Sequence, residues 1–166
     1  MNYAGAGLIL LSSDINSVLL VKDARTGKWG FTKGHREPYD SSDLETAQRE
    51  LWEEAGIASR QYQVINEPFK IKKSKSSYIF RYAVMLENER WVRLKPGPVG
   101  EVGGLAWVPI RELLDMTHIM DGNLYLRTWL DDLRNGSKRY TGLYLNLLKS
   151  QPVQIPMSTC NVVTSS

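Results

Sequence analysis

The sequence lacks the features that stabilise small extracellular domains or anchor membrane proteins. Its 166 residues include one cysteine, Cys160, so no disulfide can form within the chain. No apolar run approaches the roughly 18 residues that span a bilayer, and no basic-then-apolar leader with a cleavage site opens the chain. We therefore expect an intracellular protein, cytoplasmic or also nuclear, with no membrane partner.

The composition that remains is that of an ordinary globular protein, with 42% hydrophobic and 23% charged residues. At this length the usual prior is one domain. After Gln151 the apolar periodicity stops and Pro, Ser and Thr increase. We expect a domain over residues 1–150 and a flexible tail over 151–166.

Hydrophobic patterning predicts strands and helices in alternating groups, which is an α+β fold. The expected strands are 4–11, 18–21, 29–31, 62–69, 78–86 and 105–108. The expected helices are 43–55, 110–115 and 124–133. The first helix has clear end signals, because Ser42 and Glu45 match a capping box and Gly56 follows the last turn.

Three carboxylates share one face of the helix expected over 43–55. Glu50, Glu53 and Glu54 have i, i+3 and i+4 spacing, which brings their side chains together. An apolar stripe runs beside them: Leu44, Ala47, Leu51 and Ala55. Crowded carboxylates either form a solvated acidic face or bind a hard cation, and oxygen ligands suit Mg²⁺ or Mn²⁺ shared with phosphates.

The string Arg-Glu-Leu-Trp-Glu-Glu-Ala-Gly-Ile over 49–57, preceded by Lys33-Gly34, resembles the Nudix box of the Nudix hydrolase family. The resemblance implies a Nudix α/β/α sandwich with a mixed sheet, a loop-helix-loop motif, and hydrolysis of phosphoric anhydride bonds with Mg²⁺ or Mn²⁺. Fourteen residues separate Gly34 from Arg49, one more than in the family pattern. The resemblance implies an acidic partner for Arg49 at a position that falls on Asp40 when counted from Gly34 and on Ser41 when counted back from Arg49, and Asp40 is the chemically sensible equivalent.

The resemblance also implies roles for individual residues. The implied metal ligands are Lys33, through its backbone carbonyl, Glu50, Glu53, Glu54 and Glu101. Glu101 precedes Trp107 by six residues and is either a ligand, the general base or an ordinary loop carboxylate. The expected catalytic set is Glu53, Glu54, Glu101 and Arg49, with Arg49 orienting the glutamates.

Two segments bear on the substrate. Gly34-His35-Arg36-Glu37-Pro38 is similar to the loop of asymmetric diadenosine tetraphosphate hydrolases, although Tyr39 stands where those enzymes carry glycine. Residues 29–34 resemble the loop of Nudix mRNA decapping enzymes. We expect hydrolysis of nucleoside or dinucleoside polyphosphates. The alternatives are an RNA 5′ end or mRNA cap, a diphosphoinositol polyphosphate, or an inactive module that binds nucleotides or RNA.

Substrate contacts are expected from basic and aromatic side chains. Lys33 and His35 follow the predicted strand into the box and are candidates for phosphate contacts. Tyr82 is either a base-stacking residue or part of the core. Lys72 and Lys73 lie in a lysine-rich segment expected to be a hairpin loop, which either attracts a polyphosphate or RNA backbone or keeps the loop soluble.

Overall fold

A mixed sheet of seven strands organises the residues that the structure describes. This computed structural model describes residues 3–73, 76–88, 101–115 and 121–151. The strands are β1 (Gly5–Leu11), β2 (Ser17–Asp23), β3 (Trp29–Gly30), β4 (Thr32–His35), β5 (Tyr62–Lys73), β6 (Ser76–Met85) and β7 (Val102–Pro109). The helices are α1 (Asp43–Ala55), α2 (Ile110–Asp115), α3 (Leu124–Asn135) and α4 (Gly142–Lys149), with a 3-10 turn at Ser59–Gln61.

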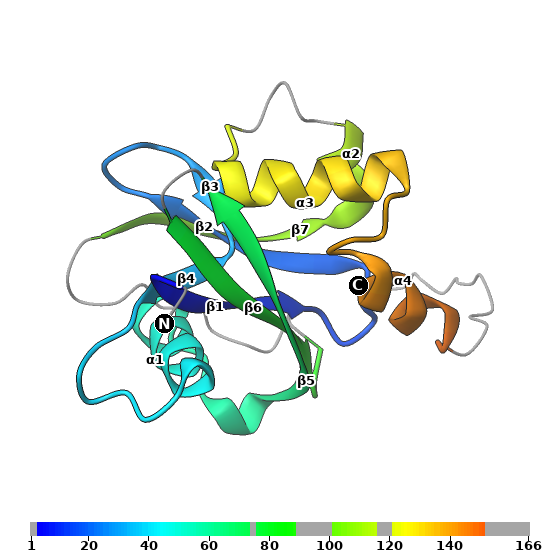
Figure 1. Cartoon of the computed structure of the whole chain (residues 1–166). Coiled ribbons are helices and arrows are strands. Elements are labelled where there is room, and N and C mark those ends of the chain that lie inside the picture. The colour runs from blue at the N-terminus through cyan, green and yellow to red at the C-terminus, as the bar shows by residue number, and fades with distance from the viewer. Residues whose placement is uncertain (1–2, 74–75, 89–100, 116–120, 152–166) are drawn as a thin grey trace, which may run out of the picture.

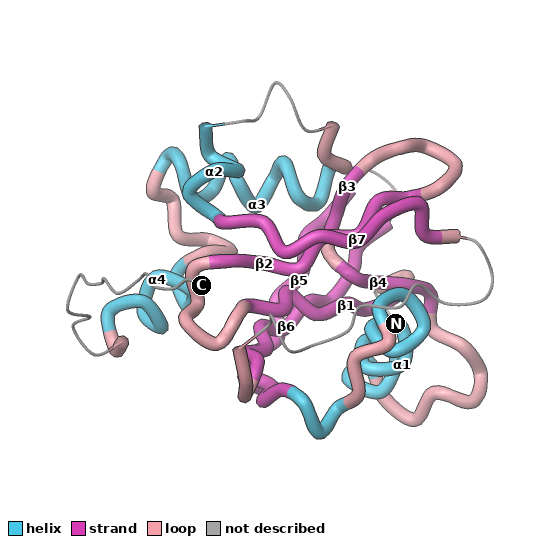
Figure 2. The backbone as a smooth tube through the Cα atoms, turned by 180° about the vertical axis from the view of Figure 1, so that it is seen from behind, coloured by secondary structure: helices cyan, strands magenta, loops and turns pink. Residues whose placement is uncertain are grey.

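Helices cover both faces of the sheet, as Figures 1 and 2 show from opposite sides. Successive side chains of β1 point to opposite faces, and all seven of its residues are buried. Leu8 packs in the core cluster beneath α1, whereas Ile9 packs in the cluster that includes Phe80 and Trp129 on the α3 side. The expected α/β/α sandwich is therefore confirmed.

β1 and β2 separate from one another close to the start of the segment that resembles the Nudix box. β1 runs parallel to β6, and the order along the main path is β3-β2-β1-β6-β5. β1 meets β2 only at Leu11 and Val18 and pairs with β4 over Gly5–Leu8 instead. β4 therefore lies in a fork between β1 and β2, and the chain leaves it to form the loop before α1 (Figure 1).

Helix α1 has the predicted bounds because both ends carry local signals. The Ser42 hydroxyl accepts a hydrogen bond from the Glu45 N–H at 3.1 Å. The Glu45 carboxylate binds the N–H and hydroxyl of Ser41, so the reciprocal half of the capping box is shifted by one residue. At the other end Gly56 takes a left-handed φ of 71° and donates to the Trp52 carbonyl.

Several expectations need correction or fall outside the described residues. β4 and α4 were not predicted. Lys70, Lys72 and Lys73 belong to β5 and not to a loop, because β5 continues past a bulge after Ile65. The expected tail lies outside the described residues from position 152 onward. Of the helices that the structure describes, none is both long and apolar enough to cross a bilayer.

Candidate active site

The acidic face of α1 meets the backbone of β4. The Lys33 N–H donates to Glu54 Oε1 at 3.1 Å. Lys33 lies opposite Gly7 of β1 in an antiparallel pair, in which a residue directs its N–H and C=O to the same side. We therefore expect the Lys33 carbonyl to lie on the Glu54 side, where it was predicted as a metal ligand.

Gly34 provides the space that the Glu50 carboxylate occupies. A Cβ atom built on Gly34 would lie 2.0 Å from the carboxyl carbon of Glu50, well inside any real contact. The carboxylate of Glu50 thus packs directly on the strand backbone. Since Glu54 binds the neighbouring Lys33 N–H, two glutamates one helical turn apart converge on residues 33 and 34.

Arg49 links the loop before α1 to the acidic face. A guanidinium has five N–H donors, and each has an acceptor here. The acceptors are Asp40 Oδ1 and Oδ2 at 3.0 and 2.9 Å, the His35 carbonyl at 3.0 Å, and Glu50 and Glu53 at 3.1 Å each. The expected ion pair between Asp40 and Arg49 is confirmed. Arg49 has no donor left for a substrate, so in this arrangement it positions other residues.

The Asp40 carboxylate is buried and fully engaged. It accepts hydrogen bonds from the Glu37 N–H at 2.8 Å and from the Thr46 hydroxyl at 2.8 Å, in addition to Arg49. The hydrogen bonds from Arg49 hold the pKa of Asp40 well below its usual range, and Asp40 in turn raises the pKa of Arg49. The pair is therefore charged at every ordinary pH.

Burial and mutual repulsion disfavour the charged forms of two glutamates. Burial raises the pKa of Glu50 to about 7, with Arg49 opposing and the charges of Glu53 and Glu101 adding to the effect. Burial raises the pKa of Glu54 to about 8, and the charge of Glu50 contributes next. Carboxylate oxygens whose charged forms are disfavoured by burial and by one another are a donor set that a divalent cation would stabilise.

Among the described residues, no three acidic, histidine or cysteine side chains already surround a common point closely enough to hold a metal ion. The Glu53 side chain is 49% exposed and turned toward Arg49, while Glu50 and Glu54 lie against β4. Mg²⁺ keeps several waters and shares positions with phosphates. A cation here would accordingly be held by few protein oxygens together with water and substrate.

Glu101 lies beside this group, just before β7. Its backbone carbonyl accepts from the Ala24 N–H at 2.9 Å, and its carboxylate is near enough to raise the pKa of both Glu50 and Glu54. Glu101 and Glu54 line a common pocket of about 80 Å³. The structure thus brings Glu101 close to Glu50 and Glu54, while its role as ligand, general base or loop carboxylate stays a prediction.

Two lysines approach one tyrosine on the α3 side of the sheet. The Lys33 Nζ lies 4.7 Å from the ring centroid of Tyr78 and 5.3 Å from that of Tyr125. The Lys73 Nζ lies 5.8 Å from the Tyr125 centroid. Burial lowers the pKa of Lys33 while Glu54 opposes that change, and Lys73 lowers it further.

Lys72, the neighbour of Lys73 on β5, points to the opposite face of the sheet and is not part of this group.

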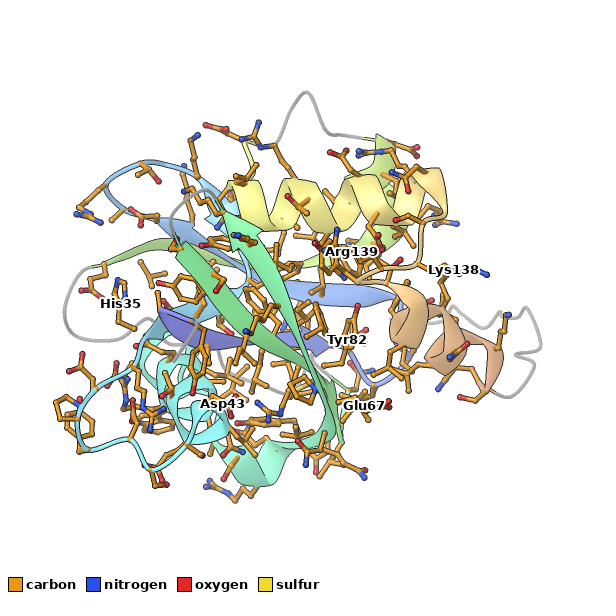
Figure 3. All side chains as sticks on the ribbon, viewed as in Figure 1. His35, Asp43, Glu67, Tyr82, Lys138 and Arg139 are labelled. Atoms are coloured by element: carbon orange, nitrogen blue, oxygen red, sulfur yellow. The ribbon has the colours of Figure 1, made fainter. Side chains whose placement is uncertain are left out.

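Of the two roles left open for Tyr82, base stacking and packing in the core, the structure supports packing in the core. Tyr82 is fully buried, and its hydroxyl donates to the Tyr140 carbonyl at 2.6 Å and accepts from Trp129 Nε1 at 2.8 Å. Figure 3 shows it well separated from His35, which is exposed at the end of β4. The aromatic ring near His35 is that of Tyr78, four residues earlier on β6, with 6.0 Å between the ring centroids. The alternation of side chains along a strand predicts that Tyr78 and Tyr82 share one face of the sheet. It does not predict which of the two tyrosines lies close to the acidic residues.

Comparisons with known proteins agree on one fold. The family model described as NUDIX domain matches residues 1–129. A C. elegans Ap4A hydrolase in a binary complex has a TM-score of 0.61 at 17% identity, over 78% of this chain and 95% of that one. A second structure of C. elegans Ap4A hydrolase gives 0.58 at 20% identity, over 82% and 97%. The NUDIX domain of Shewanella oneidensis NrtR with ADP ribose gives 0.58 at 16% identity, over 81% and 88%.

Proposed function

Because the chain belongs to the NUDIX domain family and is a hydrolase of phosphoric anhydride bonds, we propose that it is a metal-dependent diphosphohydrolase of nucleoside or dinucleoside polyphosphates. The proposed substrate is of the diadenosine tetraphosphate type, and the proposed cofactor is Mg²⁺ or Mn²⁺. The observation that carries the proposal is the convergence of Glu50 and Glu54 on the backbone of residues 33 and 34.

The chemistry follows from the charge of the substrate. A pyrophosphate linkage is shielded by its own negative oxygens, so a catalyst must neutralise them and hold a water in line with the bond that breaks. A divalent cation supplies that neutralisation when it is bound by Glu50, Glu53, Glu54 and the Lys33 carbonyl. Glu101, which lines a pocket together with Glu54, is proposed as a further ligand or as the group that takes the proton of the attacking water. Arg49 holds Glu50 and Glu53 in place.

A chain of phosphates also suits the lysines beside the carboxylates. Lys33 and Lys73 bring two ammonium groups to the ring of Tyr125, where they repel one another. Phosphate oxygens beyond the bond that breaks would relieve that repulsion. Two of the structurally similar structures are of C. elegans Ap4A hydrolase, and another is of a NUDIX domain solved with ADP ribose, which supports a nucleotide as substrate.

The RNA alternative requires a continuous basic surface. Lys70 and Lys72 project from the face of β5 opposite to Lys73, so the lysines that the structure describes on this strand do not form one stripe. This arrangement favours a compact polyphosphate over an RNA 5′ end or mRNA cap.

A matched substrate panel tests the proposal. The protein is incubated with Mg²⁺ or Mn²⁺ and with diadenosine tetraphosphate, capped RNA, triphosphorylated RNA or a diphosphoinositol phosphate, and products are separated by chromatography. We expect cleavage of the dinucleotide into tri- and monophosphate products, with the Glu53→Gln and Glu54→Gln variants strongly impaired. Release of a capped nucleotide while the dinucleotide stays intact would make the protein a decapping enzyme. Binding without cleavage of any compound would make it a binding module.

A further inference from the structure

Tyr39 is an aromatic residue held at the surface of the loop that joins β4 to α1. Among the residues that the structure describes, Tyr39 is one of the large hydrophobic residues that stay open, with 69% of its area exposed. The Asp40 N–H donates to the Glu37 carbonyl at 3.0 Å, which closes a four-residue turn with Pro38 and Tyr39 at its centre. Pro38 fixes its own φ, and the Asp40 carboxylate ties back to the Glu37 N–H. The backbone of Tyr39 is therefore fixed on both sides.

The ring of Tyr39 lies against the residue that organises the acidic face. The Arg49 Cζ is 5.4 Å from the Tyr39 ring centroid. All five N–H groups of Arg49 are already bound to other acceptors, so its contact with the Tyr39 ring is a cation–π contact and not a hydrogen bond. Arg49 in turn contacts Glu53 at 3.1 Å. A single side chain thus separates an exposed aromatic ring from the carboxylates.

We infer that Tyr39 determines specificity by stacking on the nucleobase of a substrate whose phosphates lie at Glu50 and Glu54. This inference rests on the proposed function. Arg49 lies over one face of the ring, while most of the residue's surface remains exposed beside the arginine that holds Glu50 and Glu53. Every nucleobase has a flat π face that stacks on an aromatic side chain, whereas an inositol ring or a bare phosphate chain has none. The loop of Tyr39 is the one that carries the extra residue relative to the family pattern.

Trp52 provides a matched control on the same helix. It is also exposed, at 58%, and lies three residues after Arg49. At 3.6 residues per turn it is rotated about 160° around the helix axis from Glu54. It is turned away from Glu50 and Glu54, so its removal takes away an exposed aromatic ring on the side of the helix opposite to these two carboxylates.

The experiment compares a substrate that carries nucleobases with a substrate that carries none. Initial rates with Mg²⁺ are measured for diadenosine tetraphosphate and inorganic tetraphosphate with the unmodified protein, Tyr39→Leu, Tyr39→Phe and Trp52→Ala. We expect Tyr39→Leu to raise KM for the dinucleotide about tenfold, with kcat and the KM for inorganic tetraphosphate changed less than about twofold. Tyr39→Phe and Trp52→Ala should match the unmodified protein. An equal loss of kcat on both substrates would show that Tyr39 acts only by positioning Arg49, and an unchanged KM would rule out stacking.

A binding measurement separates this inference from the proposed function. If neither compound is hydrolysed, the proposed function fails, and calorimetric titration of both compounds into the Mg²⁺-loaded protein tests Tyr39 alone. We expect the dinucleotide to bind about tenfold more tightly than inorganic tetraphosphate, and Tyr39→Leu to abolish the difference. Equal binding of the two compounds to the unmodified protein would overturn the inference.

Discussion

The Arg49 guanidinium holds the Asp40 carboxylate through two parallel hydrogen bonds, from Nε to Oδ1 at 3.0 Å and from Nη2 to Oδ2 at 2.9 Å. Only 1% of the Asp40 side chain is exposed. The remaining donors of Arg49 bind Glu50, Glu53 and the backbone of His35. One ion pair therefore fixes both the loop before α1 and two carboxylates of the acidic face.

Asp40→Asn should destabilise the fold, because it leaves the Arg49 charge without its main partner in a nearly buried position. We expect a loss of about 3 kcal/mol in the free energy of unfolding, measured by urea denaturation. Asp131→Asn is the control, since its ion pair with Arg134 is exposed and should contribute less than about 1 kcal/mol. Equal effects of the two variants would mean that the Asp40 pair does not anchor the loop.

Gly34→Ala should impair cation binding more than folding. The new methyl group would overlap the end of the flexible Glu50 side chain, which can move away at the expense of its position on β4. We expect a 10- to 100-fold weaker affinity for Mn²⁺, in the range of changes to residues that orient ligands. Gly142→Ala serves as the control, because its Cβ would meet the Lys138 Cβ at an ordinary 3.7 Å. Unchanged Mn²⁺ affinity in Gly34→Ala would separate Glu50 from the metal site.

The stability of the metal-free protein should fall as pH rises. In the folded state the pKa of Glu50 is raised to about 7 and that of Glu54 to about 8, from an ordinary value of 4.5, mainly by burial. A carboxyl group whose pKa is raised by folding binds its proton more tightly in the folded state than in the unfolded state. The stability that Glu50 and Glu54 contribute in this way is fully present below pH 4.5 and is lost as pH rises through 7 and 8. Urea denaturation in EDTA between pH 5 and 9 measures this decline.

Mg²⁺ should reverse that dependence, because it binds the ionised carboxylates and releases their protons. We expect Mg²⁺ to add more stability at pH 8.5 than at pH 6, and Glu54→Gln to flatten the decline seen in EDTA. A metal-free stability that does not change with pH would contradict the burial of these two carboxylates.

Tyr82→Phe should lower stability without affecting the substrate. The hydroxyl that it removes satisfies both the Tyr140 carbonyl and Trp129 Nε1 in the core, so we expect a cost of about 1–3 kcal/mol. KM for diadenosine tetraphosphate should remain within about twofold of that of the unmodified protein. A large rise in KM with unchanged stability would restore Tyr82 as a substrate contact.

The parts of the fold that could be predicted from the sequence are those with local causes. Helix α1 has its predicted bounds because Ser42 caps its first turn and Gly56 ends it in a left-handed conformation. Its carboxylates could be identified from i, i+3, i+4 spacing and from the resemblance to the Nudix box. The pairing of Asp40 with Arg49 also followed, because the extra loop residue does not displace Asp40 from reach.

The missed parts depend on residues distant in sequence. Helix α4 follows Thr141, which makes no side-chain cap. The turn before it is held instead by the buried carboxylate of Asp132, which accepts from the N–H groups of residues 139–141 and from the hydroxyls of Ser137 and Thr141. Strand β4 forms through its pairing with β1, and the depth of Tyr82 depends on what α3 and α4 cover. No local pattern contains that information.

Metal-dependent hydrolysis with and without the Glu54 carboxylate tests the central claim most directly. Protein freed of metal by EDTA and dialysis is assayed on diadenosine tetraphosphate before and after addition of Mg²⁺, alongside Glu54→Gln and the Trp52→Ala control. We predict no cleavage without metal, restored cleavage on adding Mg²⁺ to the unmodified protein and to Trp52→Ala, and little activity in a folded Glu54→Gln variant. Cleavage by the metal-free protein, or equal Mg²⁺-dependent rates in Glu54→Gln, would contradict the account.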